Sequence, residues 1–106
     1  EKTIIRPTFS YLGKFTISDT VFRQIIEYLA KEIPAILRVI RTRVTSTETG
    51  PSIYIELVVT YGYNIQENLR IFKEKSIKEI ENLTAMNVVT MDVIVKNVYV
   101  PGKEEV

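Results

Sequence analysis

Residues 53–61 read IYIELVVTY, and this stretch decides the fold more than any other part of the chain. Apolar side chains recur at every second position, at Ile53, Ile55, Leu57, Val59 and Tyr61. That period predicts a β-strand with one buried face. Gly62 ends the strand, and Asn64 with Glu67 three residues later predicts a capping box at the start of a helix.

The predicted helix runs to about residue 83, with one apolar stripe and one charged side. Its stripe consists of Ile65, Leu69, Phe72, Ser76, Ile80 and Leu83. Upstream of the turn at residues 47–51, β-branched residues predict a strand over residues 35–44. The buried face of that strand cannot be assigned, because Ile36, Ile40 and Val44 share one parity while Leu37 and Val39 share the other.

The N-terminal half has the same order of elements. Residues 14–17 alternate polar and apolar, which predicts a half-buried strand with Phe15 and Ile17 toward the core. Ser18 and Asp19 are suited to cap the helix that follows, and Pro34 ends it. The apolar face of this helix consists of Val21, Phe22, Ile25, Ile26, Leu29 and Ile33.

Residues 88–100 close the chain as a predicted strand. The resulting order is strand, helix, strand, strand, helix, strand, which predicts an α+β fold: a four-stranded, mainly antiparallel sheet with both helices on one face, as in ferredoxin-like folds. Residues 3–11 can add an N-terminal edge strand, since Pro7 is confined to an edge. We expect residues 1–12 to form an arm, residues 13–100 a single α+β domain, and residues 101–106 a C-terminal tail.

The face of this sheet away from the helices is the predicted contact surface. It is expected to carry Tyr54, Val58, Ile94 and Val98 beside Glu56, Thr60, Asp92 and Lys96. That mixture is more apolar than a purely solvated sheet surface, which indicates binding of a protein partner. Two ordinary explanations remain open: strands favour such residues on both faces, and the N-terminal arm can cover them.

A basic run on the strand at residues 35–44 gives an alternative. Arg38, Arg41 and Arg43, with Lys96, can contact phosphate groups or an acidic partner. They can equally guard an exposed edge strand against aggregation. The net charge is only +1, from 14 basic and 13 acidic residues, and an RNA-recognition aromatic platform is missing, so nucleic acid is the second hypothesis.

Composition argues against catalysis. The 106 residues include no His and no Cys, and no nucleophile with an adjacent base is present. We therefore predict no enzyme, with no catalytic, cofactor-binding or metal-binding residues. The apolar runs are too short for a membrane span, and the lack of Cys favours a reducing, cytoplasmic setting.

Several stretches together resemble the alkaline shock protein family, the envelope stress response proteins of Gram-positive bacteria. They are residues 11–18 (YLGKFTIS), 21–33, 58–65 (VVTYGYNI), 80–89 (IENLTAMNVV) and 93–98 (VIVKNV). The chain departs from the family pattern in two places. Ala85 stands where such proteins usually carry Gly, and the loop between the second and third predicted strands lacks their glycine-rich insertion.

The resemblance implies a non-enzymatic cytoplasmic protein that is abundant under envelope or alkaline stress. It also implies self-association and recruitment to the inner face of the membrane by a membrane-anchored protein partner. The family offers no catalytic residues to carry over to this chain.

Overall fold

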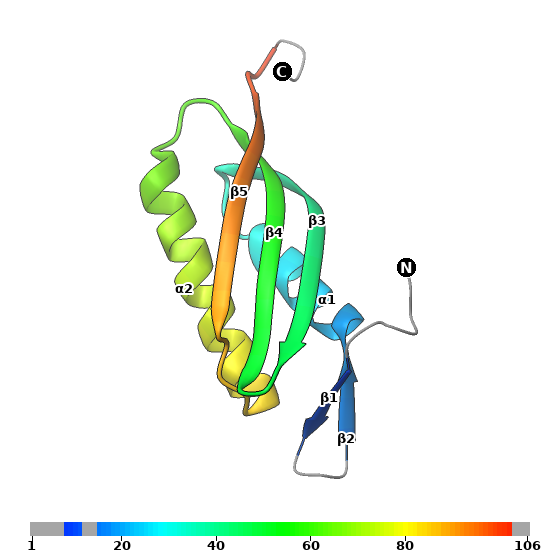
Figure 1. Ribbon diagram of the computed structural model, residues 1–106. Coiled ribbons are helices and arrows are strands. Elements are labelled where there is room, and N and C mark those ends of the chain that lie inside the picture. The colour runs from blue at the N-terminus through cyan, green and yellow to red at the C-terminus, as the bar shows by residue number, and fades with distance from the viewer. Residues whose placement is uncertain (1–7, 12–14, 103–106) are drawn as a thin grey trace.

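The structure is a computed structural model that describes residues 8–11 and 15–102, with side chains from residue 17 onward. Its elements are β1 (Thr8–Tyr11), β2 (Phe15–Ser18), α1 (Asp19–Ala30), β3 (Ile36–Thr47), β4 (Gly50–Thr60), α2 (Ile65–Thr84) and β5 (Thr90–Tyr99). Strands β3, β4 and β5 form a mixed sheet in that order, and α1 and α2 both pack on one of its faces (Figure 1). The α+β class and the one-sided helix layer are confirmed.

The predicted four-stranded, ferredoxin-like sheet is not found. β4 pairs antiparallel with β3 on one side and parallel with β5 on the other, over almost its full length. No place beside β4 is left for residues Phe15–Ser18, and β2 pairs instead with β1 in a separate antiparallel hairpin. The parallel pairing of β4 with β5 needs a crossover connection, which α2 supplies.

The core lies between the helices and β4. Ile53, Ile55, Leu57 and Val59 all face the helices and are at most 1% exposed, which confirms the predicted alternation at these four positions. The fifth predicted position, Tyr61, is wrong, because the strand ends at Thr60 and Tyr61 is 66% exposed. Phe22 and Ile26 from α1 and Phe72 and Ile80 from α2 fill the same cluster. Ile17 packs against the cluster as predicted, whereas the side chain of Phe15 lies outside the described residues.

The two helices begin in different ways. Asn64 Oδ1 accepts a hydrogen bond from the Glu67 N–H at 3.0 Å, which confirms half of the predicted capping box at α2. The Glu67 carboxylate pairs with Arg70 within the same helix. At α1, Ser18 occupies the N-cap position, but its side chain makes no capping hydrogen bond, so the predicted capping role of this hydroxyl is wrong.

The end of α2 corrects the predicted core stripe. Leu83 is 55% exposed, and Thr84 is buried in its place. The Thr84 hydroxyl donates to the Ile80 carbonyl oxygen at 2.7 Å and accepts from the Met86 N–H at 3.2 Å. Ala85 then takes the left-handed conformation, at φ 61°, which ends the helix.

Candidate functional site

Two irregularities in β3 decide which of its side chains reach the open face of the sheet, the face away from α1 and α2. The ladder with β4 shifts register between Ile36 and Arg38 and again between Val39 and Arg41, so Leu37 and Ile40 are extra residues. Each extra residue reverses the alternation of side chains. This resolves the face that the sequence left unassigned: Ile36, Val39 and Val44 turn toward the core.

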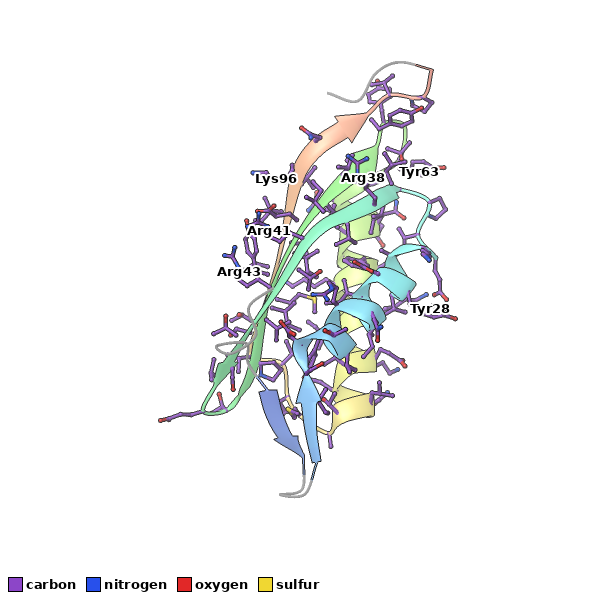
Figure 2. All side chains as sticks on the ribbon, turned by 90° about the vertical axis from the view of Figure 1, so that its right-hand side faces the viewer. Tyr28, Arg38, Arg41, Arg43, Tyr63 and Lys96 are labelled. Carbon is purple, nitrogen blue, oxygen red and sulfur yellow. The ribbon has the colours of Figure 1, made fainter. Side chains whose placement is uncertain are left out.

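The second of these shifts places three arginines together. Arg38, Arg41 and Arg43 stand opposite Val58, Glu56 and Tyr54, three alternate residues of β4 whose side chains share the open face. Figure 2 shows Arg41, Arg43 and Lys96 projecting from the sheet on the side away from the helices, whereas Tyr28 lies on the helix side. The open face is therefore strongly cationic along β3.

Glu56 is the centre of the polar contacts on this face. The Tyr54 hydroxyl donates to Glu56 Oε2 at 2.7 Å, and Arg41 Nε lies 3.9 Å from Glu56 Oε1. The hydrogen bond from Tyr54, aided by the positive charges of Lys96, Arg41 and Arg43, holds the pKa of Glu56 below its ordinary value. That bond is also the main cause that raises the pKa of the Tyr54 phenol.

Arg43 and Tyr54 make a second contact. The guanidinium carbon of Arg43 lies 5.6 Å from the centroid of the Tyr54 ring, within the range of a cation–π interaction. Tyr54 is therefore held at its ring by Arg43 and at its hydroxyl by Glu56. An aromatic side chain fixed in this way loses little conformational freedom when a partner binds.

The four predicted contact residues do not form one apolar patch. Ile94 lies opposite Glu56 and is 38% exposed, and Tyr54 is half-buried on the same face. Val58 lies on this face too, between Arg38 and Asn97 in the ladder, but it is fully buried. The open face is thus less apolar than predicted.

The predicted place of Val98 on the open face is wrong. β5 shifts register against β4 after Leu57, where Lys96 is an extra residue. Val98 consequently pairs with Val59 and packs against the core on the helix side. A single inserted residue moves every later side chain of a strand to the other face.

A hollow that the sequence did not indicate lies on the opposite side of the molecule. It measures about 740 Å³ and lies between α1 and α2, lined by apolar residues such as Ile25, Leu29 and Leu83. Tyr28, 66% exposed, stands at its edge. The only sequence signal for it would have been that Tyr28 and Leu83 border the buried stripes of the two helices.

Among residues 8–11 and 15–102, no group of three or more Asp and Glu side chains is placed to hold a metal ion. Within the same residues, no helix combines the length and apolar character needed to cross a membrane.

No family model, no curated protein and no solved structure matches this chain. The resemblance to alkaline shock proteins therefore rests on the sequence stretches alone.

Proposed function

We propose that this protein is a non-enzymatic scaffold of the envelope stress response, which binds protein partners through the open face of its sheet. One observation carries the proposal: the extra residue Ile40 aligns Arg38 with Arg41 and Arg43 opposite alternate residues of β4, on a sheet face that no described helix or strand covers. Bulges that re-aim side chains cost regular pairing, and they are common at functional sites.

The residue types on the open face favour a protein partner. Arg and Tyr are enriched among the residues that dominate protein–protein binding energy, and here Arg41, Arg43 and Tyr54 are adjacent. Ile94 adds exposed apolar area beside them. Glu56 and Asp92, on β4 and β5, add carboxylates beside the cations of β3, and a protein partner can match such a pattern of both charges.

The stress-response role is proposed on the resemblance of residues 58–65 and 80–89 to alkaline shock proteins. In this proposal the protein works in the cytoplasm, and a membrane-anchored partner recruits it to the inner face of the membrane. Self-association is part of the same proposal. If the open faces of two copies met directly, their arginines would lie close together and repel one another. We therefore expect the open face to bind a different protein in preference to a second copy.

Site-specific photo-crosslinking in the native cells tests the proposal. A photo-reactive amino acid replaces Ile94 on the open face or, as the control, Lys73 on the exposed side of α2. We expect protein adducts from position 94 under envelope stress and few from position 73. Equal adducts from both positions, or none from position 94, would contradict the proposal. Mass spectrometry of the adducts then separates a second copy from another protein.

Nucleic-acid binding is a second candidate, favoured by Arg41, Arg43 and Lys96 on one side of the sheet (Figure 2) and by Arg38, which the ladder aligns with the other two arginines. If all four cations neutralise phosphates of a single strand, the logarithm of the binding constant should fall with the logarithm of salt concentration with a slope of about −3. Fluorescence anisotropy with a labelled oligonucleotide measures that slope. A flat salt dependence would remove this candidate.

A further inference from the structure

We propose that the partner segment is an extended acidic peptide with carboxylates at alternate positions, which lies along β3 and pairs with Arg38, Arg41 and Arg43. This inference rests on the proposed function, because it specifies what binds to the open face.

The spacing of the arginines carries the argument. In sequence they stand at intervals of three and two residues, which would put them on different faces of a regular strand. The extra residue Ile40 removes that mismatch, and the three arginines stand opposite Val58, Glu56 and Tyr54, at intervals of two along β4. Two residues of a strand span about 6.6 Å, so the guanidinium groups project from points about 6.6 Å apart.

An extended peptide has the same repeat. Its alternate side chains point to one side and are about 6.6 Å apart. Three acidic residues separated by single residues therefore match the spacing of Arg38, Arg41 and Arg43, which we call the arginine row. Consecutive acidic residues would point to opposite sides and place only part of their charge near the row. In a helical peptide, residues four apart are about 6 Å apart along the axis but are turned by about 40° from each other, so three of them follow a straight row less well.

The distribution of charge places the peptide over β3 and away from the middle of the sheet. The three arginines of the row all belong to β3, which also exposes the extra residue Ile40 among them, whereas the carboxylates of Glu56 and Asp92 belong to β4 and β5. Glu56 is only 15% exposed and holds Arg41 through a long contact of 3.9 Å, while the Arg41 side chain is 55% exposed. The Arg41 guanidinium is therefore accessible, and it can pair with a carboxylate of the peptide without first breaking a short ion pair.

The same geometry disfavours a nucleic-acid strand. Binding of single strands usually combines cations with aromatic side chains on which the bases stack. The Arg43 guanidinium lies over one face of the Tyr54 ring, and Glu56 holds the Tyr54 hydroxyl, so this ring is less accessible to a base. Of the three β4 residues opposite the arginines, Val58, Glu56 and Tyr54, only Tyr54 is aromatic.

The experiment compares two labelled peptides of equal composition by fluorescence anisotropy at low ionic strength. One alternates three glutamates with threonines, and the other carries the three glutamates consecutively. We expect the alternating peptide to bind several-fold more tightly. Arg41→Gln and Arg43→Gln should each weaken that binding roughly threefold, in line with exposed charge pairs. Arg70→Gln on α2 removes the same charge from the helix side and should change nothing.

Each other outcome overturns the inference. Equal affinity for both peptides would show that only net charge matters. Tighter binding of a single-stranded oligonucleotide of equal charge would assign the row to nucleic acid, and absence of binding to either peptide would remove the acidic segment. Crosslinks from position 94 without peptide binding would leave the proposed function standing and reject only this inference, so the two failures are distinguishable.

Discussion

The two sides of β4 show how one strand serves two purposes. Toward the helices it presents Ile53, Ile55, Leu57 and Val59, all nearly inaccessible to water. Toward the open side it presents, among others, Tyr54 and Glu56, which bond to each other and to cations of the neighbouring strands. Burial of apolar area stabilises the fold in proportion to the area removed from water, whereas exposed ion pairs contribute little. We therefore assign stability to the covered side, and the proposed partner binding belongs to the open side.

The largest effect expected from this comparison is that of Phe72→Ala on the covered side. Phe72 is fully buried in the core, so its truncation should lower the free energy of unfolding by about 3–5 kcal/mol. Ile94→Ala on the open side should change it by about 0.5 kcal/mol or less. Urea denaturation followed by circular dichroism measures both. Comparable losses in the two variants would contradict the division of roles.

Gly50→Ala should come next in size, because it breaks the end of the sheet where β3 turns into β4. A Cβ at Gly50 would lie 2.0 Å from the carbonyl oxygen of Asn87, and the backbone has φ 149°. We expect a loss of roughly 2 kcal/mol or more from the strained conformation and the clash together. Gly62→Ala is the control, since its Cβ would have no atom within 4 Å and only its φ of 110° is unfavourable. A thermal melt in which both variants lose the same stability would show that the contact with Asn87 is unimportant.

Ala85→Gly should stabilise the covered side by about 1 kcal/mol. Ala85 holds a left-handed conformation at the end of α2, which glycine adopts without the steric penalty of a Cβ. The gain appears as a higher urea midpoint with an unchanged slope. An unchanged or lower midpoint would mean that the greater freedom of glycine in the unfolded chain offsets the relief.

The smallest effect concerns the titration of Glu56 on the open side. Because its pKa is lower in the folded protein, Glu56 stabilises the fold above the ordinary pKa of a glutamate. This contribution should disappear as the pH falls below about 4.3 and through the lower folded value. Urea midpoints as a function of pH should show a shallower acid-side decline for Glu56→Gln than for the original protein. Parallel curves would exclude a linkage of Glu56 to stability.

Much of the covered side could be predicted from the sequence. The alternation from Ile53 to Val59 predicts the buried face of β4, and the spacing of Asn64 and Glu67 predicts the start of α2. These signals are local, because they depend on the period of one element or on a cap within one turn. The prediction that Leu83 is buried is wrong, because Thr84 takes its place in the core. A threonine is an unexpected core residue, and its burial depends on the two hydrogen bonds of its hydroxyl at the helix end.

The open side could not be predicted to the same extent, because it depends on pairing between distant strands. The mixed parity of Ile36, Val39 and Val44 was a real signal of irregularity, but the sequence did not locate the extra residues. Nothing in residues 93–98 indicates that Lys96 is an extra residue, so Val98 was placed on the wrong face. The pairing of β2 with β1 outside the main sheet likewise depends on which strands take the two sides of β4.

Chemical-shift mapping by NMR tests the division between the two sides most directly. The isotope-labelled protein is titrated with the peptide that alternates glutamate and threonine. We predict that the largest amide shifts occur at Arg41, Arg43 and Tyr54 and that α1 and α2 hardly respond. Shifts centred on the hollow between α1 and α2, near Tyr28 and Leu83, or spread evenly over the protein, would contradict the assignment of recognition to the open face.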